Sequence, residues 1–204
     1  MVYRNEVILH GTIAEEFEFH HNNGKKTMLS AKVDVERKSK VKDTIVLQIP
    51  EWRLKEVSEL KKGDGVYICG ELKTYSYKGK DGRLHDKNYV YVKSIFGSIN
   101  MPEYNNEVKI SGKLVKKGDI RTTAEGKRII DVTIKTQCND GHKWAYIPVI
   151  FWNALAERVQ CFCEVGENIS LIGRFQSRNY IKMYADGVKS EKVTYEVSAA
   201  KLGL

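Results

Sequence analysis

The chain has 204 residues, a formal net charge of +8, and a composition that is 42% hydrophobic and 29% charged. This is the composition of a folded protein of one or two domains, and it excludes a wholly disordered chain. The longest apolar run has eight residues, 145–152, whereas a membrane span requires about 20. No basic and then apolar leader opens the sequence, so we expect a cytoplasmic protein without membrane contact.

The basic surplus favours a polyanionic partner such as nucleic acid, with solubility alone as the alternative explanation. Four cysteines are present, at Cys69, Cys138, Cys161 and Cys163. None of them forms the C-x-x-C spacing of a zinc site, and the five histidines are scattered. We therefore expect reduced thiols, no metal and no cofactor.

Two short motifs occur twice in the same order. N-E-V-I-L-H-G at residues 5–11 returns as N-E-V-K-I-S-G at 106–112, a displacement of 101 residues. K-G-D-G-V-Y-I-C-G at 62–70 returns as V-G-E-N-I-S-L-I-G at 165–173, a displacement of 103. After each last glycine the pattern x-[LF]-x-[ST]-x-x-Y follows. The repetition indicates two copies of one domain, which we call copy 1 and copy 2.

Copy 1 alternates between strand patterns and turn signals. Alternating apolar residues predict strands over 3–13, 29–35, 44–49, 66–72 and 89–95, with turns at 22–24 and 78–83. Between the third and fourth strands, Pro50 fits the first turn of a short helix. We expect Trp52, Val57 and Leu60 to form the buried stripe of that helix.

Copy 2 follows the same order. It predicts strands near 106–117, 127–136, 143–151, 167–178 and 192–199, and a helix near 153–163 with Asn153 as its N-cap. Five short strands with a helix between the third and fourth are typical of the OB-fold. The sequence thus predicts an all-β protein with one short helix per domain: two tandem five-stranded Greek-key OB-fold barrels. Their expected bounds are 1–98 and 106–204, with a linker at 99–105.

These motifs resemble those of the bacterial single-stranded DNA-binding protein family, in a tandem OB-fold form. The family opens with N-x-V-x-L-x-G, as at residues 5–11, and 147–157 looks like its third strand and helix. The resemblance implies single-stranded DNA binding without sequence preference in replication, repair or recombination. It also implies replication or recombination proteins as partners, and a homodimer that brings four barrels together.

The resemblance further implies base-stacking aromatics at corresponding positions. The third-strand aromatics of the family fall at Tyr146 and Trp152, and the aromatic after the fourth strand falls at Tyr180 and, in copy 1, at Tyr77. The third strand of copy 1 departs from this pattern. Either Ile49 or Pro50 aligns with Trp152, depending on the register, and neither is aromatic.

Single-strand binding requires aromatic rings that stack on bases and cations that neutralise phosphates. In copy 2, alternation places Trp144, Tyr146 and Trp152 on one face of the third strand. The alternative is that these rings cap the barrel. The other copy 2 candidates follow the glycine of the fourth strand: Arg174, Arg178, Tyr180 and Lys182.

Copy 1 offers a second basic and aromatic set. Its candidates on the fourth strand and the following hairpin are Lys73, Tyr75, Tyr77, Lys78, Lys80 and Arg83. Arg37 and Lys38 begin a basic run between strands two and three. An ordinary solvated loop or strand face remains the alternative for these charges.

Catalytic motifs are absent from the sequence. It contains no G-x-x-x-x-G-K-[ST], G-x-S-x-G or H-E-x-x-H pattern, so we expect a binding protein and not an enzyme. Two other functions remain open. One is a primosomal or replisome adaptor that acts through protein contacts, favoured by the missing third-strand aromatics of copy 1. The other is RNA binding, because stacking alone hardly separates RNA from DNA.

Overall fold

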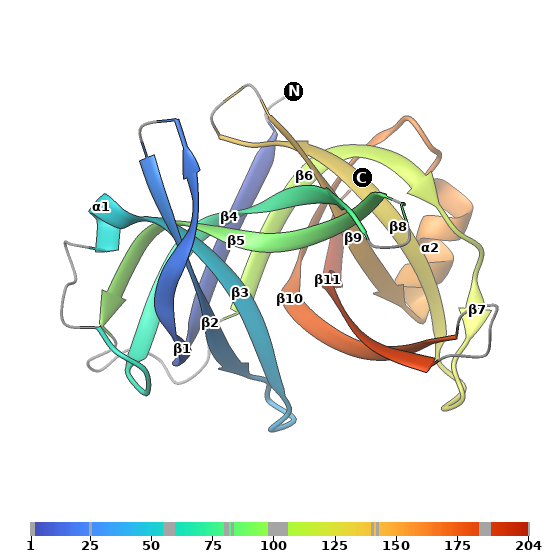
Figure 1. Ribbon diagram of the computed structural model, residues 1–204. Coiled ribbons are helices and arrows are strands. Elements are labelled where there is room, and N and C mark those ends of the chain that lie inside the picture. Colours follow the sequence, from blue (N-terminus) through green and yellow to red (C-terminus); the bar gives the residue numbers. More distant parts are fainter. Residues whose placement is uncertain are drawn as a thin grey trace.

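The computed structural model describes residues 3–24, 26–54, 60–79, 82, 84–97, 106–139, 141, 143–183 and 189–203. The side chains of Asn23 and of residues 180–192 also lie outside this description. Two barrels lie side by side, copy 1 at the left of Figure 1 and copy 2 at the right. Within the described residues, no helix has the length and apolar character needed to cross a membrane.

Copy 1 is a closed five-stranded barrel. Its elements are β1 (Arg4–Asn23), β2 (Lys26–Glu36), β3 (Lys42–Pro50), α1 (Glu51–Leu54), β4 (Gly65–Lys78) and β5 (Leu84–Gly97). Strand β1 pairs with β2 and β4, β2 with β3, and β4 with β5, all antiparallel. The parallel pair of β3 and β5 closes the barrel. Alternating side chains such as Val33, Ile45 and Val90 fill its interior and are fully buried.

Copy 2 repeats this connectivity. Its elements are β6 (Asn106–Lys117), β7 (Arg121–Thr122), β8 (Arg128–Gln137), β9 (Trp144–Trp152), α2 (Ala154–Phe162), β10 (Asn168–Met183) and β11 (Lys189–Gly203). The parallel pair of β9 and β11 closes the second barrel. The prediction of two tandem OB-fold barrels is therefore confirmed. The domain bounds stay a prediction, because the expected linker lies outside the described residues.

Strands β1 and β6 join the two barrels around a pseudo-twofold axis. Val7 pairs with Val108, Asn5 with Ile110, and Leu9 with Asn106. Asn106 is the repeat of Asn5, and Ile110 is the repeat of Leu9. Asn5 therefore pairs with the repeat of Leu9, and Leu9 pairs with the repeat of Asn5. This is the self-complementary contact of a symmetric dimer, formed within one chain.

The repeated asparagine ties the first strand of each copy to the fourth. In copy 1 the Asn5 amide donates to the Leu72 carbonyl oxygen over 2.8 Å, and its oxygen accepts the Leu72 N–H over 2.9 Å. Asn106 makes the same two bonds to Phe175, at 2.8 and 2.9 Å. Both asparagines are almost fully buried. A shorter or apolar residue there would leave two buried backbone groups unpaired.

The repeated glycines mark positions where two backbones approach closely. A Cβ on Gly70 would collide with the carbonyl oxygen of Tyr91, and one on Gly173 with that of Ser198. A register shift interrupts the strand pairing directly before each of these glycines. The motif therefore records a shared backbone geometry and carries no binding chemistry itself.

Some local expectations are wrong. Pro50 is the last residue of β3 and not part of the helix. Trp52 is 46% exposed instead of buried, with the Arg53 guanidinium 4.4 Å from its ring centre. Val57 lies outside the described residues. Asn153 is the N-cap residue of α2, as predicted, but its side chain makes no capping hydrogen bond. Its side-chain oxygen instead accepts the backbone N–H of Arg128 at 3.2 Å.

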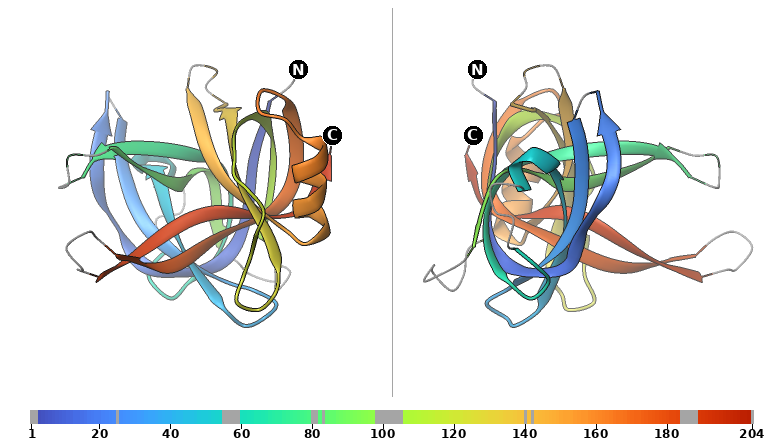
Figure 2. Two further views of the ribbon diagram at one scale, coloured as in Figure 1. Left: turned by 90° about the vertical axis from the view of Figure 1, so that its right-hand side faces the viewer. Right: turned by 60° about the vertical axis from the view of Figure 1, so that its left-hand side comes forward.

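Each barrel extends one hairpin as a long arm. The arms of β4–β5 and β10–β11 project beyond the barrels in Figure 2, and they are longer than the sequence pattern predicted. Thr74 of the first arm contacts β9: its hydroxyl accepts the N–H of Tyr146 at 2.8 Å and donates to the Tyr146 carbonyl at 3.1 Å. In the second arm, the N–H of Ser177 donates to the Asp43 carboxylate of copy 1 at 2.9 Å. Each arm thus reaches the other copy, and this positions the surfaces described next.

Candidate nucleic-acid interface

Strand β9 separates core and surface side chains as the sequence predicted. Its inner face holds Ala145, Ile147, Val149 and Phe151, each at most 1% exposed. On the outer face, Trp144 is 39% and Tyr146 is 42% exposed. The outer row is not continuous, because Ile150 is also buried, at 2% exposed. The exposed aromatics therefore gather toward the first end of the strand.

A cation that the sequence analysis did not select lies over these rings. Lys135 of β8 pairs with Tyr146, and its ammonium lies 4.5 Å from the centre of the Trp144 ring and 5.9 Å from that of Tyr146. Tyr3 packs edge to face against Trp144, at 5.2 Å between centroids. The alternation along β8 that buries Ile134 also turns Lys135 outward, so the signal was present in the sequence.

The third strand of copy 1 lacks this cluster. A Cβ on Gly11 would meet the carbonyl of Asp34, and one on Gly112 that of Lys135, so these two carbonyls are equivalent. Asp34 pairs with Thr44 as Lys135 pairs with Tyr146. Counting along β3 then makes Thr44 the copy 1 equivalent of Tyr146 and Pro50 the equivalent of Trp152. Of the two registers considered for Pro50, the structure has this one, and it supplies no aromatic.

Trp152 lies at the far end of β9, in a groove of about 460 Å³. The indole is half-buried, and its Nε1 donates to the Ser198 hydroxyl at 3.1 Å. We call this the basic groove; its lining residues are Arg37, Lys127, Trp152, Arg174, Gln176, Ser177, Arg178, Ser198 and Ala199. Four of the nine carry a positive charge and none a negative one.

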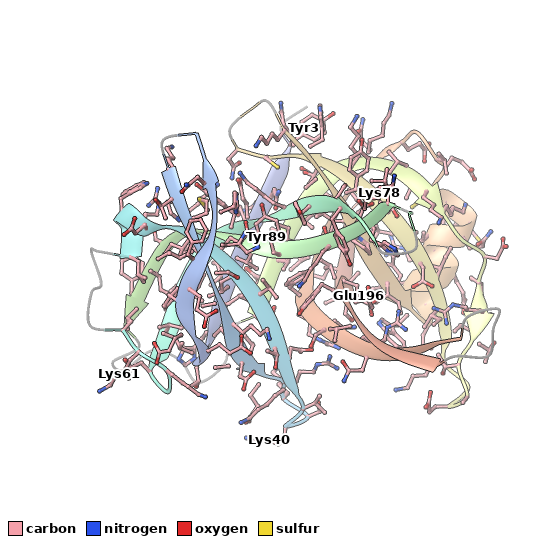
Figure 3. All side chains as sticks on the ribbon, viewed as in Figure 1. Tyr3, Lys40, Lys61, Lys78, Tyr89 and Glu196 are labelled. Atoms are coloured by element: carbon pink, nitrogen blue, oxygen red, sulfur yellow. The ribbon has the colours of Figure 1, made fainter. Side chains whose placement is uncertain are left out.

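The cations of the basic groove differ in their partners. Arg178 forms an ion pair with Glu196 at 3.1 Å; Figure 3 labels Glu196 on β11. Arg174 donates to the Gln176 amide oxygen at 3.1 Å and has no carboxylate partner among the described residues. Its Nε is buried without a hydrogen-bond partner in that same set. Arg174 is therefore a strong candidate for neutralising a phosphate.

Arg37 belongs to copy 1 and holds the two copies together. Its guanidinium makes two 2.6 Å hydrogen bonds to the carboxylate of Asp43, which is fully buried. Asp43 also accepts the backbone N–H of Ser177 in copy 2 at 2.9 Å, and Arg37 donates to the Ser177 carbonyl at 3.3 Å. Arg37 thus lines the groove while its charge is largely balanced by Asp43.

A second groove, of about 480 Å³, combines both copies. We call it the aromatic groove; its lining residues are His20, His21, Met28, Gln48, Lys73, Thr74, Tyr75, Tyr89, Tyr91, Cys138, Lys143 and Trp144. Figure 3 shows Tyr89 between the two barrels. Burial raises the pKa of Tyr89 to about 12, so its phenol stays neutral.

The arm of β4 and β5 carries a short stack of rings beside this groove. Tyr75 and Tyr77 are 51% and 42% exposed, and their rings lie 5.9 Å apart at an angle of 12°. His85 continues the stack at 5.5 Å from Tyr77. Exposed flat rings of this kind offer faces to unpaired bases.

The remaining predicted residues are distributed less evenly. Lys78 ends β4 at the far end of the first arm (Figure 3), and Lys38 is on the loop after β2. Lys73 is only 14% exposed and pairs with Glu71 at 3.1 Å. Tyr180 and Lys182 lie in β10, but their side chains are outside the described residues, as are Lys80 and Arg83 entirely.

Comparisons with known proteins agree with this geometry. The model of the single-strand binding protein family matches residues 4–97 and again 105–204. The chain is 28% identical over 102 residues to "Single-stranded DNA-binding protein B" of Bacillus subtilis, a match covering 44% of this chain and 88% of that protein. It is also 28% identical over 96 residues to "Single-stranded DNA-binding protein" of Enterococcus faecalis, covering 45% and 51%.

A solved structure shares the tandem fold. The wild-type single-stranded DNA binding protein from Thermus aquaticus superposes with a TM-score of 0.77 at 17% identity, covering 100% of this chain and 93% of that one. At this identity the likeness concerns the fold. The family model, in contrast, matches each copy over nearly its full length. The chain therefore belongs to the single-strand binding protein family.

Proposed function

We propose that this protein binds single-stranded DNA without sequence preference, through base stacking and phosphate contacts and without covalent chemistry. The observation that carries the proposal is the position of β9. Its ends are about 26 Å apart, with Trp144 in the aromatic groove at one end and Trp152 in the basic groove at the other.

The two kinds of contact have different roles. Rings stack on any base, because every base has a flat face, and each stack is worth about 1–3 kcal/mol. Cations such as Arg174 and Lys135 neutralise phosphates, and this makes binding weaker as the salt concentration rises. Neither contact reads base edges, so the surface suits strands of any sequence.

The biological setting is part of the proposal. Membership of the family supports a role in replication, repair or recombination in the cytoplasm, with proteins of those processes as partners. We also propose a homodimer, in which two chains present four barrels. Light scattering across micromolar concentrations should give twice the chain mass; a monomer mass throughout would contradict the dimer.

A fluorescence titration tests the binding function. We expect long oligo-dT to quench the emission of Trp144 and Trp152 with a defined stoichiometry, more strongly at low than at moderate salt. Trp52 lines neither groove, so a Trp52→Phe background removes its emission without touching the site. Duplex DNA is the control and should bind much more weakly. Equal affinity for duplex DNA, or no binding at low salt, would contradict the proposal. Tighter binding of a matched RNA oligomer would show that the ligand is RNA and not DNA.

A further inference from the structure

We propose that the aromatic groove is a separate nucleobase site, whereas the basic groove is the phosphate site. The inference rests on the proposed function and adds a division of roles between the two grooves. Unstacked bases enter beside Tyr75, Tyr91 and Trp144, and the phosphates of the same strand are held by Arg174 and its neighbours in copy 2.

The two grooves occupy equivalent places in the two copies. Tyr75 follows Gly70 by five residues, as Arg178 follows Gly173. The carbonyls that face these glycines belong to Tyr91 and Ser198, which line the aromatic and the basic groove respectively. Arg178 and Ser198 of the basic groove thus correspond to two tyrosines, Tyr75 and Tyr91, of the aromatic groove.

The positive charge of the aromatic groove is partly cancelled. The ammonium of Lys73 lies 4.1 Å from the centre of the Tyr91 ring and pairs with the buried carboxylate of Glu71 at 3.1 Å. Lys93 reaches the same carboxylate at 3.1 Å. Glu71 follows Gly70 as Arg174 follows Gly173. The carboxylate of Glu71 therefore stands in copy 1 where copy 2 has Arg174.

Carboxylates also border the outer end of the aromatic groove. An adjoining groove of about 490 Å³ shares His20, Gln48, Tyr75 and Tyr89 with it. It adds three carboxylates, Glu15, Glu16 and Glu18, and two lysines, Lys32 and Lys87, of which Lys32 pairs with Glu15 at 2.7 Å. Both first strands shift register at the same place, between Ile13 and Glu15 and between Leu114 and Lys116. The counterpart of Glu15 is therefore Lys116, a reversal of charge.

These carboxylates set how a strand can lie. Three carboxylates against two lysines make this end less attractive to phosphates than the basic groove, while rings remain available beside it, since Phe19 is 64% and Tyr75 is 51% exposed. At the other end, Lys143 lines the groove and Lys135 lies over Trp144. A strand therefore turns its bases into the aromatic groove and keeps its phosphates on the copy 2 side.

The test compares two probes of equal length: oligo-dT and an abasic deoxyribose-phosphate oligomer. We expect the double variant Tyr75→Ala/Trp144→Ala to lower affinity for oligo-dT by at least about 25-fold, because two stacks are lost. Its affinity for the abasic oligomer should change by no more than about twofold. Arg174→Ala should weaken binding of both probes by the same factor. Phe96→Ala, an aromatic 50% exposed outside both grooves, is the matched control and should change neither.

Restoring a flat ring separates stacking from structure. Tyr75→Phe should bind oligo-dT as the wild type does, and an unchanged unfolding midpoint shows that each variant is folded. Equal losses for both probes in Tyr75→Ala/Trp144→Ala, or no loss for oligo-dT, would overturn this inference alone, because the wild type would still bind. A wild type that binds neither probe would overturn the proposed function as well.

Discussion

The basic groove and the aromatic groove lie at corresponding positions of two copies that share one backbone plan. In copy 2 the positions after the last glycine hold Arg174 and Arg178, and in copy 1 they hold Glu71 and Tyr75. The frame residues, by which we mean the buried asparagines and the glycines that recur in both copies, have not diverged in the same way. Asn5 and Asn106 make identical pairs of hydrogen bonds.

The difference follows from burial. Replacing a frame asparagine or glycine leaves buried backbone groups unpaired or forces two backbones together, and both are costly. Tyr75 and Arg178 are about half exposed, so exchanging a cation for a ring there costs little stability. Glu71 is buried, and its charge is balanced by Lys73 and Lys93. Duplication thus allowed the two surfaces to acquire different chemistry while the barrels stayed alike.

Breaking the link between the copies should have the largest effect. We expect Asp43→Ala to lower the free energy of unfolding by about 3 kcal/mol, because it leaves the partly buried Arg37 without its counter-charge. Urea unfolding measures this. Asp131→Ala is the matched control, since its ion pair with Arg121 has both side chains about half exposed and should cost less than about 1 kcal/mol. Equal costs would contradict a structural role for the Arg37–Asp43 pair.

The two frame asparagines should behave alike. Asn5→Ala and Asn106→Ala each leave one buried N–H and one buried carbonyl unpaired, so we expect each to cost about 2–3 kcal/mol. The measurement is again urea unfolding, with the exposed Asn179→Ala as control. A large cost in one copy and none in the other would show that the shared frame is not equally important in both.

Reversing the acidic end of copy 1 should make the grooves more alike. Glu15→Lys introduces the charge that Lys116 has in copy 2 and removes the carboxylate that pairs with Lys32, so affinity for oligo-dT should rise at low salt. The plot of log affinity against log salt should steepen by about 0.7 for each new phosphate contact. Glu6→Lys makes the same charge change on β1 outside all three grooves and should leave the slope unchanged. Identical slopes for both variants would rule out phosphate repulsion by Glu15.

The smallest effect concerns pH. Partial desolvation, and then the charges of His21 and Lys87, lower the pKa of His20 from 6.5. The unfolded chain then binds a proton at His20 more readily than the folded chain does. Above about pH 6.5 His20 is neutral in both states and does not change the free energy of unfolding, whereas it lowers that free energy as the pH falls toward the folded-state pKa. We expect His20→Gln to lose less unfolding free energy than the wild type between about pH 7.5 and about pH 5.5. An equal loss in both proteins would contradict this.

The fold was largely predictable from the sequence. The N-x-V-x-[LI]-x-G motif and the later glycines recur because each has a backbone reason, and strand alternation separated Phe151 from Tyr146 correctly. Local details failed where tertiary contacts take precedence over local preference. The side chain of Asn153 bonds to β8 and not to its own helix, and Trp52 packs with Arg53 at the surface instead of in the core.

The candidate site was predictable only in part. The aromatics Trp144, Tyr146 and Tyr75 were found by alternation along single strands. Lys135 was missed, because its importance depends on the neighbouring strand that carries the rings. The contact of Arg37 and Asp43 with Ser177 was also invisible, since it joins residues of different copies through the second arm.

Photocrosslinking of an oligo-dT that contains 4-thiothymidine, followed by peptide mapping, tests most directly whether one strand uses both copies. The account predicts base crosslinks to peptides of copy 1 that carry Tyr75 or Tyr91, and also to the peptide of copy 2 that carries Trp144. Crosslinks confined to copy 2 would contradict the central claim that copy 1 supplies a nucleobase site.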